Sequence, residues 1–368
     1  MIKILIITTV KVSYDGLTNH ILSYVEEMNK DNLVIDLVSA RGIDSKIDKR
    51  LKNAGFNKIN RLEFRDNNQL KYFMCLTKLI RKEKYNIVHA HGNSATLAIE
   101  MAAAFFGGCK VRIAHSHNTQ CEHKTANKLL KPFFNLFYTD GFACGEEAGK
   151  WLFKNRKFTI IPNGIKINKF VFNKNVRERI RQNLNIEKNT IAIGNVAAFV
   201  KKKNHIFLIN TFNELLKKKK NYKLFLFGIE GDNLEKVISL IKELKLEEKI
   251  IYMGTKENIN EYLNAMDIMV LPSEFEGFPI SVIEWQINGL PCILSNTITD
   301  KCKISNSVQF VPINNGSNPW INAIINLNQR NENGNDILIY NNNFDINANA
   351  EKLKQLYIEL VNKRKVGV

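Results

Sequence analysis

Short apolar runs alternate with amphipathic stretches along most of the chain. In the first half the apolar runs are rich in Ile, Val and Phe, and they cover residues 3–9, 33–39, 59–64, 86–92, 110–116 and 141–145. Between them, the stretches 19–30, 70–84 and 125–138 have apolar positions at helical spacing. Continuous apolar strands separated by helices are typical of a parallel sheet that is covered on both faces. The pattern predicts a doubly wound α/β domain.

The same alternation restarts in the second half. Strands are predicted at 190–199, 222–229, 249–254, 267–273 and 292–296, and helices at 205–218, 233–246, 259–266 and 279–288. Pro162-Asn163-Gly164 marks a turn near the junction. We therefore expect two Rossmann-like domains, 1–165 and 166–345, with a ligand cleft between the carboxyl ends of their strands.

The C-terminal part of the chain has two further features. An Asn-rich stretch from 326 to 343 is predicted to be a polar segment. Asp345 is a plausible N-cap for a final helix over 348–363. Residues 346–368 are assigned to a helix that returns to the N-terminal domain.

Composition supports a folded protein of two domains. The chain has 368 residues, of which 45% are hydrophobic, enough to bury sizeable cores. The first apolar run lacks a signal-peptide pattern, and the apolar run Ala95 to Cys109 contains Glu100 and is too short to span a membrane. We expect a cytoplasmic protein. Its six cysteines form no CxxC pair, so they are expected to be reduced, and no metal site or cofactor is predicted.

The formal net charge of +17 suggests an anionic partner. Nucleic acid, an anionic membrane surface and a phosphate-bearing small substrate all fit such a charge. The basic residues are spread along predicted helices, without a zinc finger or a basic-aromatic repeat, which argues against nucleic acid. Peripheral contact with the inner face of the cell membrane stays open, since the stretch 125–138 is basic and partly apolar.

Two carboxylates frame the strand-to-helix junction in SEFEGFPISVIEWQINGLP, residues 273–291. Glu276 falls in the loop, and Glu284 falls in the second turn of a helix whose first turn suits Pro279. Helical side chains lean toward the N-terminus, so Glu284 is expected to reach back toward the loop. The backbone amides near Gly277 and Phe278 lie at the positive helix end, which favours a diphosphate. Hydroxyls of a sugar and a ribose would separate this diphosphate from the carboxylates.

This segment resembles the Glu-seven-residues-Glu signature of the retaining glycosyltransferases of family 4, which have the GT-B fold. The likeness continues along nearly the whole chain, in the first strand and its loop, in NIVHAHG and RIAHSHNT, in IIPNGI and in FVKKKNHIFLI. The nearest likeness is to bacterial capsular and exopolysaccharide glycosyltransferases. The resemblance implies an N-terminal acceptor domain and a C-terminal domain that binds a nucleotide-diphosphate sugar, with UDP favoured.

The resemblance also implies roles for individual residues. Glu284 would bind the ribose, Glu276 the transferred sugar, and His117 the sugar near its reacting carbon. Lys203 would contact the diphosphate, although the register could slip to Lys202. The resemblance thus implies three catalytic residues, namely His117, Lys203 and Glu276. The remaining donor-binding positions implied by the family pattern are Gly16, Gly254, Thr255, Lys256, Gly277, Phe278 and Pro279.

Two positions depart from the family pattern. Ala197 and Ala198 stand where the family has a Gly-Arg pair, so half of the usual cationic clamp is absent. Asp15 replaces the first glycine of the usual pair before helix one. The first departure keeps an alternative open, namely a catalytically impaired GT-B protein that acts as a basic membrane- or nucleic-acid-binding module.

The reaction implied by the resemblance is transfer of a hexose, with retention, to a glycan or polyprenyl-linked saccharide acceptor. Electrostatic stabilisation of the leaving diphosphate by Lys203 and the helix N-terminus would supply most of the catalysis. No DxD pair occurs in the chain, so a metal-bridged diphosphate is not expected. A glycoside hydrolase also uses two carboxylates, but it would not need the lysine-bearing second domain.

Overall fold

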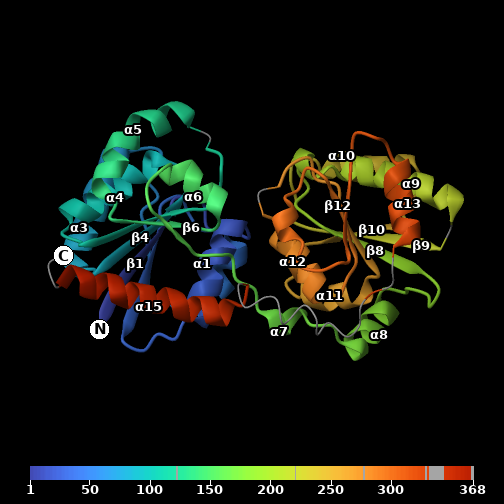
Figure 1. The fold of residues 1–368 in the computed structure, drawn as a ribbon, viewed down its shortest axis with the longest axis horizontal. Coiled ribbons are helices and arrows are strands. Elements are labelled where there is room, and N and C mark those ends of the chain that lie inside the picture. The colour runs from blue at the N-terminus through green and yellow to red at the C-terminus, as the bar shows by residue number, and fades with distance from the viewer. Residues whose placement is uncertain (122, 220, 277, 328–329, 331–343, 366–368) are drawn as a thin grey trace. The chain divides into compact units, whose positions relative to one another are not determined.

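A computed structural model of the chain describes residues 1–368 except 122, 220, 277, 328–329, 331–343 and 366–368. The chain divides into two compact units, one formed by Met1–Ile165 with Asn343–Val368 and the other by Lys166–Asn342. Each unit contains one parallel β-sheet with helices around it (Figure 1). The predicted α/β fold is therefore confirmed. Most of the Asn-rich stretch 326–343 lies outside the described residues.

The first unit is built on seven parallel strands in the order β3-β2-β1-β4-β5-β6-β7. The strands are β1 (Ile2–Thr8), β2 (Leu33–Ser39), β3 (Lys58–Arg61), β4 (Ile87–Gly92), β5 (Val111–Ser116), β6 (Asp140–Ala143) and β7 (Thr159–Ile160). The helices are α1 (Gly16–Glu27), α2 (Asp48–Asn53), α3 (Gln69–Glu83), α4 (Ala98–Phe106), α5 (Lys124–Phe137), α6 (Glu146–Phe153) and α15 (Ile346–Lys365).

Alternate residues of the central strand β1 enter two separate cores. In β1, Ile4 and Ile6 pack with α1 and α15, whereas Leu5 and Ile7 pack with α3 and α4 on the other face. This alternation is the period of two that a strand buried on both faces requires. Figure 1 shows α15 beside α1, although the two helices are far apart in sequence. The last helix therefore completes the core of the first unit.

The cap of α15 explains where this helix begins. The Asn347 backbone N–H donates to Asp345 Oδ1 at 3.0 Å, as the predicted N-cap requires. The helix runs over Ile346–Lys365 and is thus longer than the predicted 348–363. Tyr357 is buried at its centre.

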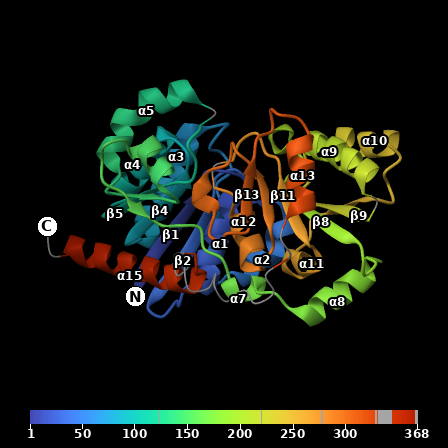
Figure 2. The same cartoon turned by 45° about the vertical axis from the view of Figure 1, so that its right-hand side comes forward.

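The second unit is built on six parallel strands in the order β10-β9-β8-β11-β12-β13. The strands are β8 (Ile191–Val196), β9 (Tyr222–Phe227), β10 (Ile250–Gly254), β11 (Ile268–Leu271), β12 (Cys292–Ser295) and β13 (Val308–Val311). The helices are α7 (Ile167–Phe170), α8 (Lys174–Asn183), α9 (His205–Lys218), α10 (Leu234–Glu243), α11 (Ile259–Ala265), α12 (Ile280–Ile287) and α13 (Asn318–Asn326). Figure 2 shows α9 and α10 above these strands and α8 and α11 below them.

Helix α12 starts one residue later than the sequence suggests. Pro279 occupies the N-cap position with extended backbone, and Ile280 is the first helical residue. A proline is tolerated there because the N–H that it lacks has no helical partner at the start of a helix. Glu284 keeps its predicted place in the second turn.

One ion pair is buried in the first unit. Arg65 Nε donates to Glu100 Oε1 at 2.7 Å, and the Glu100 side chain has no exposed surface. Removal of either partner would leave an uncompensated buried charge, which would destabilise the folded unit.

Among the described residues, no helix combines the length and the hydrophobicity needed to cross a bilayer.

Candidate functional site

The predicted donor-binding residues of the second unit follow consecutive strands of one sheet. The loops after β10, β9, β8 and β11 begin at the carboxyl edge of the sheet, where ligands bind in folds of this kind. Gly254 ends β10, and the loops after β8 and β11 carry the turn Lys201–Lys203 and Glu276. Sequence positions as far apart as 201 and 276 therefore meet at one edge.

Lys203 and Glu276 form an ion pair at this edge. Lys203 Nζ donates to Glu276 Oε1, and the two side chains are only 18% and 10% exposed. Ser273 Oγ donates to the same carboxylate oxygen at 2.8 Å. The Lys202 carbonyl accepts a hydrogen bond from the Glu274 backbone N–H at 2.8 Å, so the two loops are joined through the main chain as well. Two of the three predicted catalytic residues are thus brought together.

The Glu284 carboxyl lies among protein atoms although its side chain is partly accessible. Desolvation raises the pKa of Glu284 to about 7, and the nearby Lys169 ammonium opposes this rise. Lys169 belongs to α7, which packs against α12. A carboxyl with such a pKa exchanges its proton near neutral pH, and in either state it can hydrogen-bond a hydroxyl.

The predicted donor-binding positions Gly254, Thr255 and Lys256 lie near the end of β9. The Gly228 N–H donates to the Gly254 carbonyl at 3.1 Å, and Thr255 Oγ1 donates to the Gly228 carbonyl at 3.2 Å. Gly254 has a φ of +65°, a conformation that favours glycine. Lys256 Nζ lies 5.7 Å from the centre of the Tyr262 ring.

The loop after β8 passes very close to Gly228. A Cβ at Gly228 would lie 1.8 Å from the Ala197 carbonyl oxygen, so no other residue fits there without movement. Ala197 itself is buried, whereas Lys201 and Lys202 are exposed. Lys203 has an ion-pair partner, whereas Lys201 and Lys202 form no ion pair with any residue that the structure describes.

The residues before α12 are described in part. Gly277 lies outside the described residues. Phe278 is partly buried and Pro279 is buried, so Pro279 is positioned by packing. The role of these residues in donor binding stays a prediction.

In the first unit, His117 lies within a cluster of five histidines. This histidine cluster consists of His20, His89, His91, His115 and His117. His91 and His115 are register partners in β4 and β5, and His20 comes from α1. Burial lowers the pKa of all five, to about 4 for His20 and about 3 for His89. The imidazoles are therefore neutral at pH 7.

Gly16 is exposed at the start of α1, where open space faces its Cβ position. The Asp15 carboxylate caps this helix and accepts from the backbone N–H groups of Leu17 and Thr18 at 2.9 and 3.0 Å. Part of the positive helix end therefore already has an anionic partner in the chain itself.

Three residues of these sites were not singled out by sequence reasoning. Ser273 is a common polar residue three positions before its partner Glu276, and Lys169 lies in α7, in a different segment from its partner Glu284. His20 lies in a predicted amphipathic helix, and only its place after the first strand could have pointed to the sheet edge.

Comparisons with known proteins agree with this architecture. Residues 14–169 match the family described as Glycosyltransferase Family 4, and residues 176–309 match Glycosyl transferases group 1. An Escherichia coli enzyme, UDP-Gal:alpha-D-GlcNAc-diphosphoundecaprenol alpha-1,3-galactosyltransferase, is 28% identical over 79% of this chain and 80% of its own length. The capsular polysaccharide biosynthesis glycosyltransferase CapH of Staphylococcus aureus is 24% identical over 86% of this chain and 88% of its own length.

A solved structure shares the fold over almost the whole chain. HepE of Anabaena, crystallised with UDP and glucose, superposes with a TM-score of 0.77 at 16% identity and covers 98% of this chain and 100% of its own. The two family matches follow each other along the sequence, one in each unit. The chain therefore belongs to the glycosyltransferases of the GT-B fold, with a family 4 domain followed by a group 1 domain.

Proposed function

We propose that this glycosyltransferase moves a hexose from a UDP-sugar to a lipid-linked saccharide, with retention of the anomeric configuration, in the biosynthesis of a surface polysaccharide. The observation that carries the proposal is the arrangement of Lys203, Glu276 and Glu284 at the carboxyl edge of the second sheet. The activity for which the Escherichia coli relative is named supports this class of donor and acceptor.

The proposed donor site assigns one chemical task to each charged group. Lys203 carries a positive charge that offsets the charge developing on the diphosphate. Glu276 and Glu284 accept hydrogen bonds from hydroxyls of the sugar and the ribose. The amides at the start of α12 add donors for the phosphates.

The reaction breaks the bond between the anomeric carbon and the β-phosphate oxygen. The acceptor hydroxyl oxygen forms its bond to that carbon on the same face, and its proton passes to the leaving phosphate oxygen. UDP is the other product. Since the phosphate takes the proton, the site needs no dedicated general base.

The Lys203–Glu276 ion pair leads us to expect a change of partners when the donor binds. Without donor, Lys203 is neutralised by Glu276. A bound diphosphate competes with Glu276 for the same ammonium, so Lys203 exchanges partners as the donor binds. Glu276 is then released toward the sugar hydroxyls, while Ser273 stays as its second hydrogen-bond partner.

The lysine turn allows a matched test of the proposed role. We expect Lys203→Met to lower kcat by about 10²- to 10³-fold, the loss seen when a transition-state charge partner is removed. Lys201→Met is the control, because this lysine belongs to the same turn but is exposed. Equal losses in both variants would contradict the assignment, and a loss confined to Lys202→Met would move the role by one residue.

Product analysis tests the function as a whole. The purified chain is incubated with UDP-galactose, UDP-glucose, UDP-N-acetylglucosamine or GDP-mannose and with a diphosphoundecaprenyl-linked N-acetylglucosamine. Mass spectrometry detects a product heavier by the transferred sugar residue, and proton coupling at the new anomeric centre reports its configuration. We expect transfer from a UDP-sugar with retention. Transfer from GDP-mannose alone, inversion, or no product with any donor would contradict the proposal.

The acceptor class implies a membrane-facing surface on the first unit. Leu129 and Leu136 are each 69% exposed on α5, and Phe133 between them is 55% exposed. Phe105 and Phe106 of the neighbouring α4 are also exposed. Exposed apolar residues on one helix beside basic ones suit the boundary of an anionic membrane.

The membrane contact has its own measurement. We expect the chain to cosediment with phosphatidylglycerol vesicles and much less with phosphatidylcholine vesicles at low salt. Leu129→Ser with Phe133→Ser should reduce this binding by about tenfold, since two large apolar side chains are lost. Val171→Ser, an exposed apolar position of the other unit, is the control. Binding that is the same in the double variant as in the unchanged chain would contradict this surface.

A further inference from the structure

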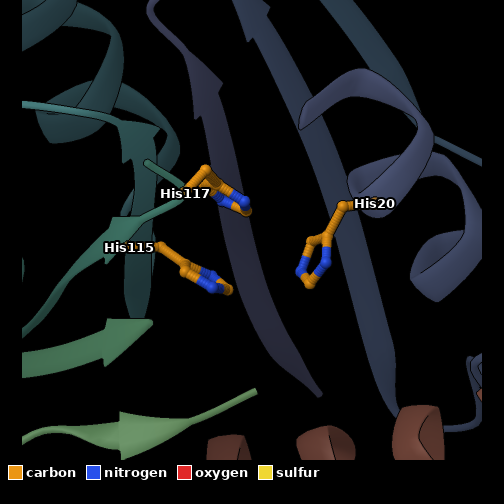
Figure 3. A group of neighbouring side chains, drawn as sticks. All are labelled: His20, His115 and His117. Atoms are coloured by element: carbon orange, nitrogen blue, oxygen red, sulfur yellow. The ribbon is translucent and has the colours of Figure 1, made fainter. Parts of the chain in front are cut away.

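The histidine cluster concentrates nitrogen ligands at one edge of the first sheet. His89 and His91 in β4, and His115 and His117 in and after β5, form two His-x-His motifs on neighbouring strands. Their side chains share a face of the sheet with α1, from which His20 projects. Figure 3 shows His115 and His117 pointing toward His20. One potential ligand atom from each of these three residues lies within 4.8 Å of the other two.

Each of these three rings has one nitrogen in a hydrogen bond and a second nitrogen left over. His20 Nδ1 lies 2.9 Å from Asn163 Oδ1, His115 Nδ1 lies 3.1 Å from His89 Nε2, and His117 Nε2 lies 2.9 Å from His91 Nδ1. An amide oxygen only accepts, so His20 Nδ1 carries the hydrogen and Nε2 has the lone pair. His115 Nε2 is buried without a partner among the described residues. The second nitrogen of each ring is thus available to donate its lone pair to a metal ion.

We propose that His20, His115 and His117 bind one Zn²⁺ or another borderline divalent transition metal. Three neutral imidazoles with a fourth position open to water are a common ligand set for zinc. The proposed ligands include no carboxylate or carbonyl oxygen, which Mg²⁺ and Ca²⁺ require, so those ions are excluded from this site. This inference concerns the first unit and does not depend on Lys203, Glu276 or Glu284. It assigns His117, which the family resemblance places at the donor sugar, to the metal instead.

The spacing suits a metal after small rotations of the rings. For three nitrogens within 4.8 Å of one another, a central point lies at most about 2.8 Å from each, and zinc–nitrogen bonds are about 2.0–2.1 Å. The His117 side chain is partly exposed, unlike those of His20 and His115. Solvent therefore reaches the group from the His117 side, where the fourth ligand would be water.

The other trio with ligand atoms at this spacing, His89, His91 and His115, is less suitable. Both nitrogens of His89 are engaged, Nδ1 with Tyr357 Oη at 2.7 Å and Nε2 with His115. His89 instead serves as a positioning residue. When His115 Nε2 binds a metal, its Nδ1–H donates to His89 Nε2, and His89 Nδ1–H then donates to Tyr357. Such outer partners orient metal-bound histidines.

Cobalt titration tests the site without reference to sugar transfer. The full chain is treated with a chelator, dialysed and titrated with Co²⁺, whose visible absorption reports tetrahedral nitrogen coordination. Zn²⁺ affinity is measured by competition with a coloured chelator, and Mg²⁺ is the negative control. We expect one Co²⁺ per chain, displacement by Zn²⁺ and no response to Mg²⁺.

Variants assign the binding to these residues. We expect His20→Ala and His115→Ala to weaken Zn²⁺ binding by about tenfold or more, and Tyr357→Phe to weaken it by about tenfold. His123→Ala is the matched control, because this histidine is exposed and lies outside the cluster. Cooperative thermal unfolding identifies the variants that fold. His117→Ala, at a partly exposed position, is used in place of any cluster variant that does not fold. Zn²⁺ binding that survives in folded cluster variants, or that is lost equally in His123→Ala, would overturn the proposal, as would no tetrahedral cobalt signal.

Discussion

Replacing Glu284 by glutamine should change how the stability of the second unit depends on pH. The pKa of this carboxyl is raised from its ordinary value of 4.5 to about 7, mainly by desolvation. The folded chain therefore binds a proton more tightly at this group than the unfolded chain does. Folding stability that comes from the group is complete below pH 4.5 and is lost as pH rises through about 7. Glutamine cannot ionise and removes this dependence.

The size of the effect follows from the two pKa values. One pKa unit corresponds to about 1.4 kcal/mol, so the interval between 4.5 and about 7 sets an upper limit of about 3 kcal/mol. The Glu284 side chain is partly accessible, and solvent screening reduces this figure. Between pH 5 and pH 8, we expect the free energy of unfolding of Glu284→Gln to gain about 1–2 kcal/mol over that of the unchanged chain.

Tryptophan fluorescence during urea unfolding is a suitable assay. Trp285 and Trp320 are fully buried in the second unit, so most of the signal change reports that unit. Glu257→Gln, on an exposed turn of the same unit, is the control and should parallel the unchanged chain at each pH. A constant difference between the free energies of unfolding of Glu284→Gln and the unchanged chain from pH 5 to 8 would refute the reasoning. So would a loss of stability of Glu284→Gln relative to the unchanged chain as pH rises.

Two further substitutions probe the first unit. Asp15→Asn keeps an N-cap for α1 but removes its charge, so we expect UDP-sugar affinity to rise about twofold to fivefold with unchanged stability. Isothermal titration measures this affinity. A weaker or unchanged affinity would show that the charge of Asp15 does not act on the donor phosphates. Glu100→Gln leaves Arg65 as an uncompensated buried charge and should lower the free energy of unfolding by about 3–5 kcal/mol. Urea unfolding measures this loss. The control is Glu146→Gln, which breaks the exposed ion pair with Lys150 and should change the free energy of unfolding by less than about 0.5 kcal/mol.

The fold was accessible from the sequence because both sheets consist of parallel strands buried on two faces. Such strands are continuous apolar runs, and the run at 86–92 became β4 at Ile87–Gly92. The start of α12 was predicted to within one residue, since proline restricts where a helix begins. The residues of the last helix were also anticipated, although the helix is longer than expected.

The contacts within the candidate sites were less accessible, because they join distant segments. Lys203 and Glu276 are 73 positions apart, and sequence reasoning assigned them to different parts of the donor rather than to each other. Their pairing follows from the sheet order, which places the ends of β8 and β11 side by side. His20 was missed for a related reason. A single histidine in an amphipathic helix carries no signal until the strands that it faces are known.

The position of α15 has a consequence for how the protein is made. Tyr357, Leu353 and the other buried residues of α15 complete a core whose remaining members lie before residue 166, yet the ribosome synthesises α15 only after the whole second unit. The apolar surface next to α1 stays uncovered while the entire second unit is translated. The nascent first unit is therefore a natural client for chaperones, and its core closes only once α15 has left the ribosome.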